Sequence, residues 1–308
     1  MPTGGFRLFR VFGVDVFLHW SWFLVAAYEI RQRQNTYSTP AWMVAEYLTL
    51  FAIVLLHEFG HAFACRSVGG TANRIVLWPL GGLAYVDPPP RPGAVLWSIV
   101  AGPLVNLVLV PVTFIAYVIA LRAGLRTDFP DLCTYLKTIA WLNVALLVFN
   151  VLPIYPLDGG KILHALLWFV LGRGRSLAVA SFIGVLGALG FAALAFASAD
   201  LWLGVIAFFF ITQSLIGFQQ AKALRRLAKA PRHDSLACPS CDASPLRGPY
   251  WSCDQCGTAF DTFEHRAVCP NCFARFRTTK CPNCHNVHPI DAWIATAEPA
   301  EPLDVHPA

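Results

Sequence analysis

The sequence predicts an all-α polytopic membrane protein with about six transmembrane helices, a short re-entrant β-hairpin and a small cytosolic cysteine-rich tail. Three observations predict this class. Hydrophobic residues make up 56% of the 308 residues and charged residues only 13%, whereas soluble domains carry about a quarter charged residues. Several apolar runs are long enough to span a bilayer, and eight of the ten cysteines lie between Cys238 and Cys284. An ordinary soluble globular fold is therefore excluded.

The apolar runs define the expected spans. Runs that could cross about 30 Å of hydrocarbon cover residues 14–30, 41–68, 94–121, 132–152, 176–198 and 201–219. A further helix is expected at 160–172, too short to span alone. Between the second and third runs, RIVLWPLGGLAYVDPPPRPG alternates apolar residues around a Gly-Gly pair and ends in prolines, which predicts a hairpin or re-entrant loop.

The distribution of basic residues predicts the orientation in the bilayer. Six spans place both termini on the same side, and cytosolic loops carry an excess of Lys and Arg. With the N-terminus inside, the opposite side keeps only Arg31, Arg33, Arg122 and Arg126. The cytosolic segments then hold Arg7, Arg10, Arg66, Arg74, Arg91, Lys161, Arg173, Arg175 and the run KALRRLAKAPR. We expect a multi-pass protein of a bacterial inner membrane with cytosolic termini.

The second apolar run contains LLHEFGHAFA, in which His57, Glu58 and His61 form an H-E-x-x-H motif. Residues i and i+4 share one face of a helix, so both imidazoles can bind one zinc ion beside the glutamate. Two histidines hydrogen-bonded to neighbouring helices are the alternative interpretation. Because a glutamate between them is costly in a bilayer, the pattern favours a metal ion and a glutamate that exchanges protons with water.

A catalytic zinc site needs a third protein ligand and an open position. The stretch NVLPIYPLDGG supplies Asp158, which follows two helix-breaking prolines and precedes two glycines. Aspartate is also a common helix-capping residue, and this is the competing interpretation of Asp158.

Four segments in order, HEFGH, WPLGG, AGPLVN and NVLPIYPLDGG, resemble the site-2 protease family of intramembrane zinc metalloproteases over about residues 10–220. The resemblance implies zinc ligation by His57, His61 and Asp158, with Glu58 as the catalytic acid and base. It also implies that the partners are membrane-anchored proteins, cleaved within or next to a transmembrane segment in the lipid bilayer.

Three further residues, Asn150, Gly81 and Gly82, are weaker candidates. Asn150 precedes Asp158 by eight residues, as in the family pattern, and its amide could hydrogen-bond the oxyanion or the substrate backbone; a helix-terminal hydrogen bond is the alternative. Gly81 and Gly82 could let a substrate strand lie against the hairpin edge, although a plain turn would also use glycines. His19 and Asn106 are expected to be packing or hydrogen-bonding residues.

The cysteine-rich tail predicts two structural zinc sites. Its ligands fall in four C-x-x-C pairs, which typically bind metal in twos: Cys238, Cys241, Cys253, Cys256, Cys269, Cys272, Cys281 and Cys284. We expect a tandem zinc ribbon in which the first pair joins the second and the third joins the fourth, with an interleaved pairing as the alternative. The expected cofactors are therefore one catalytic and two structural zinc ions.

These features divide the chain into four parts. We expect a membrane domain at 1–220, a basic linker at 221–236, the zinc ribbons at 237–290 and a disordered tail at 291–308. Because acidic residues are interspersed with the basic ones, the tail favours protein docking over nucleic-acid binding.

Two alternative functions can be weighed from the sequence. A catalytically silent adaptor of the same fold that binds membrane clients is disfavoured by the intact H-E-x-x-H motif. A metal transporter is disfavoured because no internal repeat is apparent.

Overall fold

The computed structural model describes residues 5–32, 35–78, 81–284 and 286–293. Arg33, Pro79, Leu80 and residues 294–308, which enter the expectations above, lie outside the described residues. The chain divides into two compact units, Met1–Leu224 and Arg225–Ala308, and the helix α8 runs across the boundary between them.

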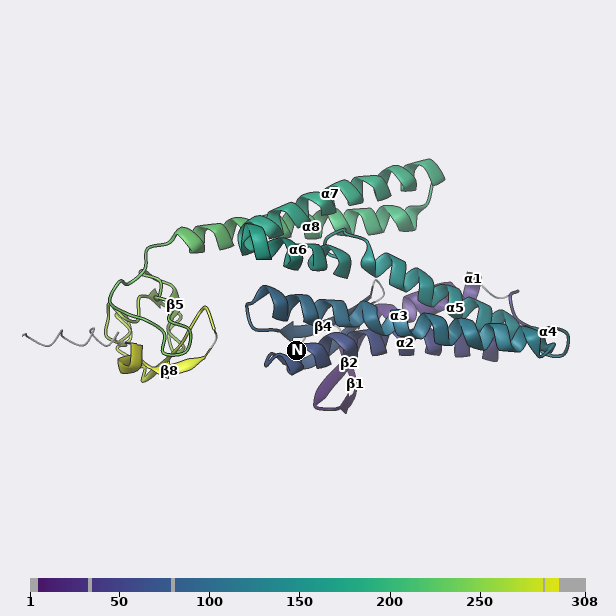
Figure 1. Ribbon diagram of the computed structural model, residues 1–308, viewed down its shortest axis with the longest axis horizontal. Helices are drawn as coiled ribbons and strands as arrows, with labels where there is room; N and C mark the ends of the chain where they lie inside the picture. Colours follow the sequence, from purple (N-terminus) through teal and green to yellow (C-terminus); the bar gives the residue numbers. More distant parts are fainter. Residues whose placement is uncertain (1–4, 33–34, 79–80, 285, 294–308) are drawn as a thin grey trace, which may run out of the picture. The chain divides into compact units, whose positions relative to one another are not determined.

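The first unit combines helices with one four-stranded sheet (Figure 1). Its helices are α1 (Ser21–Gln32), α2 (Pro40–Ser67), α3 (Pro92–Arg122), α4 (Leu125–Asp128), α5 (Pro130–Val151), α6 (Asp158–Leu171), α7 (Arg173–Ser198) and α8 (Leu201–Lys229). Its strands are β1 (Gly5–Val11), β2 (Val14–His19), β3 (Thr71–Trp78) and β4 (Gly81–Asp87), in the order β1-β2-β3-β4.

Five helices in the described part of the chain are long and apolar enough to cross a membrane: α2, α3, α5, α7 and α8. Three of them, α2, α3 and α5, begin with proline, which lacks the N–H that a first turn leaves unpaired. The helix α6 has 14 residues and is about 21 Å long at 1.5 Å per residue, so it does not span alone.

The expected first span at 14–30 is not a continuous helix. Its first part is strand β2, which pairs with β1 on one side and parallel to β3 on the other, and α1 follows with only 12 residues. The backbone of β2 is thus hydrogen-bonded within the sheet, which permits a strand at membrane depth. The sheet is also larger than the single β3–β4 hairpin expected from the sequence.

The segment formed by β2 and α1 nevertheless runs beside α2 in the opposite direction for most of the length of that helix. At the C-terminal end of α2, the Arg66 guanidinium donates hydrogen bonds to the carbonyl oxygens of Phe12 and Gly13, just before β2. Nearer its N-terminal end, the Tyr47 hydroxyl donates to the carbonyl oxygen of Trp22 in α1, at 2.9 Å. A strand followed by a short helix therefore takes the place of the expected first helix.

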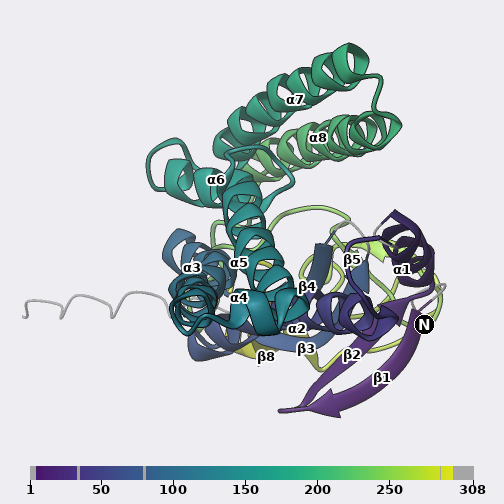
Figure 2. The same cartoon turned by 90° about the vertical axis from the view of Figure 1, so that its right-hand side faces the viewer.

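The core of this unit lies between α2 and the sheet, which pack face to face (Figure 2). The buried residues that form it are Val14, Val16, Trp22, Val54, Phe59, Ala62, Cys65, Ala72, Ile75 and Leu77. A second apolar cluster joins Leu157, just before α6, to Ala188 of α7 and Phe210 of α8. The loop before Asp158 is thus packed against α7 and α8, and α2 is seated on the sheet.

The second unit has little regular structure. Its strands are β5 (Trp251–Ser252), β6 (Ala259–Phe260), β7 (Thr278–Lys280) and β8 (Val287–Pro289), paired as two hairpins and followed by the 3-10 helix η1 (Ile290–Trp293). Trp293 is fully buried against Cys238 and Cys281. The fold therefore extends to Trp293, beyond the boundary expected at residue 290.

Asp261 connects separate loops of the second unit. Its Oδ2 accepts hydrogen bonds from the His233 ring, at 2.9 Å, and from the Gly248 N–H, at 2.7 Å. Its Oδ1 accepts from the N–H groups of Phe263 and Glu264. Burial alone would raise the pKa of Asp261, but these donors outweigh it and lower the pKa below its usual value.

Candidate metal centres

The helix α2 presents His57, Glu58 and His61 at the buried side of the first unit. All three side chains are buried, and their ligand atoms lie within 4.8 Å of one another. The i and i+4 spacing places the two imidazoles on one face of the helix, where the ring planes are nearly perpendicular at 83°.

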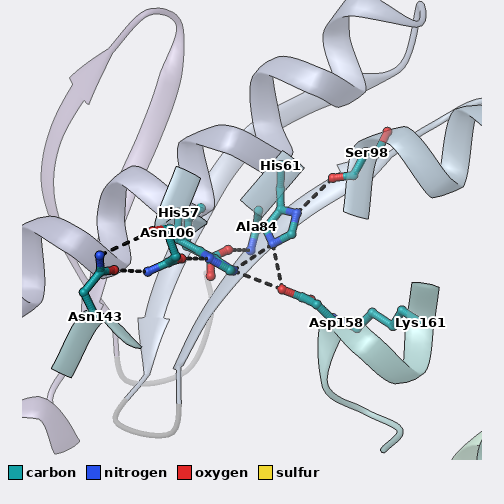
Figure 3. A network of polar contacts seen from close by, with 9 residues as sticks. His57, His61, Ala84, Ser98, Asn106, Asn143, Asp158 and Lys161 are labelled. Carbon is teal, nitrogen blue, oxygen red and sulfur yellow. Dashed lines mark hydrogen bonds and ion pairs between the residues drawn. The ribbon is translucent and has the colours of Figure 1, made fainter. Parts of the chain in front are cut away.

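The neighbouring helix α3 places an oxygen beside the Nδ1 atom of each imidazole (Figure 3). His61 Nδ1 lies 2.9 Å from the carbonyl oxygen of Ser98, which can only accept. His57 Nδ1 lies 2.5 Å from Asn106 Oδ1, and Asn106 Nδ2 donates to Asn143 Oδ1 of α5 at 2.8 Å. With both Nδ1 atoms donating, the Nε2 atoms are left with free lone pairs in the neutral rings.

Asp158, the first residue of α6, approaches these lone pairs from the opposite side. Its Oδ2 lies 3.0 Å from His57 Nε2 and 3.1 Å from His61 Nε2, and the two Nε2 atoms are 3.1 Å apart. In this tautomer three acceptor atoms lie at these distances, an arrangement that a metal cation among them would stabilise. Ligands of one tetrahedral zinc, with bonds of 2.0–2.2 Å, are about 3.3 Å apart, so this donor set fits zinc.

Glycine is required where α3 passes the two imidazoles. A Cβ added to Gly102 would lie 2.3 Å from His61 Nε2 and 2.8 Å from His57 Nε2. The loop before α6 is equally tight, since a Cβ on Gly159 would lie 2.2 Å from the carbonyl oxygen of Val151. The AGPLVN and LDGG segments therefore allow three helices to meet at one point.

Glu58 faces the sheet. Its Oε2 accepts a hydrogen bond from the backbone N–H of Ala84, at 2.9 Å, in the edge strand β4. The carboxylate is thus held beside the two imidazoles and next to the strand edge that β3 does not occupy.

For three other residues near the site, the contacts in the structure differ from what the sequence led us to expect. Asn150 is half-buried in the last turn of α5, and its side chain makes no hydrogen bond to any residue in the described part of the chain. Asn143 and Lys161 were not identified beforehand, although both contact the site. The contact of Lys161 with Asp158 could have been predicted from the DGGK segment, because its first and last residues are one helical turn apart.

The cysteines of the second unit form two clusters, and their pairing is nested. The outer cluster contains Cys238, Cys241, Cys281 and Cys284, and the inner cluster contains Cys253, Cys256, Cys269 and Cys272. The tandem pairing expected from the sequence is therefore wrong, and so is the interleaved alternative. The inner ribbon closes locally around Phe260, while Trp293 and Phe263 complete the outer core only when the last pair folds back onto the first.

The geometry of both clusters suits a tetrahedral thiolate site. The Sγ–Sγ distances are 3.7 Å (Cys238–Cys284) and 3.8 Å (Cys241–Cys281) in the outer cluster. In the inner cluster they are 3.5 Å (Cys253–Cys272) and 3.6 Å (Cys256–Cys269). Four sulfurs bound to one zinc at about 2.3 Å would be about 3.8 Å apart, and all eight cysteines are free thiols.

Comparison with known proteins identifies relatives of the first unit. Peptidase family M50 matches residues 45–129 and 119–194. A zinc metalloprotease from Methanocaldococcus jannaschii is 33% identical over 184 residues, 58% of this chain and 50% of the relative. Stage IV sporulation protein FB of Bacillus subtilis is 36% identical over 124 residues, 39% of each chain. The chain thus spans half or less of the length of these curated relatives.

A solved structure is also similar. The structure described as a site-2 protease from Methanocaldococcus jannaschii superposes with a TM-score of 0.52 at 28% sequence identity. The match covers 70% of this chain and 95% of that one.

Proposed function

Because the chain belongs to peptidase family M50, the site-2 protease family, we propose that it is an intramembrane zinc endopeptidase. Its substrates would be membrane-anchored proteins, hydrolysed within or next to a transmembrane segment. The observation that carries this proposal is the convergence of His57 Nε2, His61 Nε2 and Asp158 Oδ2 within 3.1 Å. Three ligands from two helices, buried in an integral multi-pass membrane protein, suit a zinc ion with one position left for water.

Each residue of the membrane site would then have a defined role. His57, His61 and Asp158 would hold the zinc ion, which supplies Lewis-acid chemistry by acidifying water and polarising a carbonyl group. Glu58 would take a proton from water as the carbonyl carbon is attacked and return it to the leaving amine. The Asn150 side chain, half-buried and without a hydrogen bond among the described residues, would donate to the oxyanion or the substrate backbone; a purely structural role is the alternative.

The outer edge of β4 would offer a place for the substrate. β4 is the last strand of the sheet, and the N–H of Ala84 on this strand points to Glu58 and not to β3. An extended substrate segment that added to this edge would lie beside the catalytic carboxylate, as peptides do in β-augmentation. Gly81 and Gly82, which begin the strand, would allow close approach of the substrate backbone.

We also propose that both termini are cytosolic, in a bacterial inner membrane. The segment of β2 and α1 runs opposite to α2 for most of its length, so it would count as the first crossing and keep the total even. His57 lies ten residues before the end of α2 at Ser67, about 15 Å at 1.5 Å per residue. The zinc site would therefore be nearer the cytosolic face. A reporter fused at Ala308 should be cytosolic and one inserted near Asn35 external.

The nested ribbons would bind two structural zinc ions and dock a cytosolic protein. Four thiolates leave no open position for a catalytic water, so their role would be to fold the second unit. Nucleic acid is not the expected partner.

The decisive test is Glu58→Gln in the full chain, compared with wild type and with Glu46→Gln. Glu46 is the other glutamate of the described part of α2, twelve residues earlier, and it accepts a hydrogen bond from the Tyr37 hydroxyl that glutamine could also accept. Cleavage of a membrane-anchored reporter and zinc content are measured together. Glu58→Gln should bind three zinc ions and cleave nothing, while Glu46→Gln should cleave normally. Retained cleavage by Glu58→Gln would refute the proposed role of Glu58 and the proposed mechanism.

A further inference from the structure

Lys161 lies where a lysine is unexpected. It belongs to the first turn of α6, near the positive end of the helix dipole, where a cation is disfavoured. Apart from Lys161 itself, Asp158 and His164, the helix consists of apolar residues and glycine, and the Lys161 side chain is only 38% exposed. A specific partner is therefore needed to offset the free-energy cost of a positive charge at this position.

That partner is the oxygen of Asp158 that the histidines do not contact. Lys161 Nζ lies 3.2 Å from Asp158 Oδ1, whereas Oδ2 faces both imidazole Nε2 atoms at 3.0 and 3.1 Å (Figure 3). The two oxygens of one buried carboxylate thus have separate partners. The ammonium lies on one side and the two nitrogen lone pairs lie on the other.

We propose that Lys161 is a positioning residue that keeps Asp158 a monodentate zinc ligand. This inference rests on the proposed function. A carboxylate can bind zinc through one oxygen or two, and the second oxygen would compete for the position that a catalytic site leaves open for water. A charge-assisted hydrogen bond from Lys161 to Oδ1 holds that oxygen away from the metal, so that only Oδ2 is presented.

A simple helical ion pair is the competing explanation. Residues i and i+3 are neighbours on a helix surface, and such pairs stabilise helices slightly. An ion pair of that kind would affect the stability of α6 without changing how Asp158 binds a metal. The coordination number of the metal therefore distinguishes the two explanations, while activity alone does not.

The test uses the full chain in detergent, loaded with cobalt at the membrane site. A mild chelator removes one zinc ion and leaves two in the closed cysteine sites, and cobalt is then titrated in. The variants are Lys161→Met, which removes the charge and keeps the length, and Lys161→Arg, which keeps a donor. Lys137→Met, an exposed lysine of α5, is the control. Visible absorption reports the cobalt geometry, and the titration reports affinity.

The expected result is a change in cobalt coordination on loss of the donor. Lys161→Met should show the weaker visible absorption of a higher coordination number and about 10–100-fold weaker cobalt binding, as for other groups that orient metal ligands. Lys161→Arg and Lys137→Met should resemble wild type. A wild-type spectrum and affinity in Lys161→Met would overturn the proposal, whatever its activity. If Lys161→Met does not fold, an altered cobalt spectrum in Lys161→Arg would also overturn the proposal.

Failure of the proposed function would give a different result. If the wild-type chain bound no cobalt after extraction, or if Asp158→Ala kept the wild-type spectrum, the zinc site itself would be wrongly assigned. Neither result depends on the identity of residue 161.

Discussion

Replacing Gly102 by alanine would place a methyl group against both imidazoles of the membrane site. The added Cβ would lie 2.3 Å from His61 Nε2, 2.4 Å from His61 Cε1 and 2.8 Å from His57 Nε2, whereas ordinary contacts begin at 3.4 Å. The shortfall at His61 is about 1 Å, far beyond the tolerance of about 0.2 Å in metal–ligand distances. The substitution would therefore directly displace the proposed zinc ligands His57 and His61.

Neither way of relieving this contact preserves the site. If the His61 ring rotates away, its Nε2 leaves the triangle formed with His57 and Asp158. If α2 and α3 separate by about 1 Å, the 2.9 Å contact of His61 with Ser98 and the 2.5 Å contact of His57 with Asn106 both lengthen beyond the usual range of about 2.7–3.2 Å for a hydrogen bond. A ligand displacement of about 1 Å commonly costs about 100-fold in rate, so we expect at least that loss of activity.

The assay compares Gly102→Ala with Gly190→Ala. Gly190 is also a helical glycine, on α7, and a Cβ there would meet nothing within 4 Å. Zinc affinity of the membrane site and cleavage of a membrane-anchored reporter are measured for both. Gly190→Ala should be unchanged or stabilised by up to about 1 kcal/mol. Wild-type zinc affinity and cleavage in Gly102→Ala would refute the tight packing of α3 against the histidines.

Three further outcomes are expected. Asn106→Leu should weaken zinc binding by about 10–100-fold, measured by chelator competition, because His57 loses the acceptor for its Nδ1 proton; unchanged affinity would contradict this role. Asp261→Asn should lower the free energy of unfolding of the second unit by about 2–4 kcal/mol, measured by urea unfolding. Because the pKa of Asp261 is lowered, its stabilisation is complete above the unfolded pKa of about 4, so this difference should not shrink between pH 7 and pH 5. A chain ending at Ala230 should bind one zinc ion in place of three and still cleave an unstructured peptide; loss of that cleavage would show that the tail supports the membrane site.

Local sequence patterns were sufficient to predict those features of the molecule that depend only on residues close together in the sequence. His57 and His61 share a helix face because an α-helix has 3.6 residues per turn. The apolar runs of α2, α3, α5, α7 and α8 meet the length that a bilayer requires. The C-x-x-C spacing brings two sulfurs to one turn, so the existence of cysteine clusters was predictable.

Other features depend on contacts that no local pattern contains. An apolar run such as residues 14–30 satisfies helix and strand equally, and only pairing of β2 with β1 and β3 selects the strand. Partners for the C-x-x-C pairs are likewise selected by the packing of Trp293 and Phe260 into separate cores.

The surroundings of the membrane site were also decided by tertiary structure. Asn106 of α3 and Asn143 of α5 are 37 residues apart in the sequence. Asn106 also reaches His57, because Gly60 lets α2 approach Ala101 of α3 closely. Lys161 becomes significant only when Asp158 turns one oxygen toward α2 and the other toward α6. The sequence by itself determined which side chains can bind a metal, because that is a property of each residue and its helical neighbours. Tertiary structure alone decided which atoms of those side chains face the proposed metal position, because that depends on where α2, α3, α5 and α6 cross.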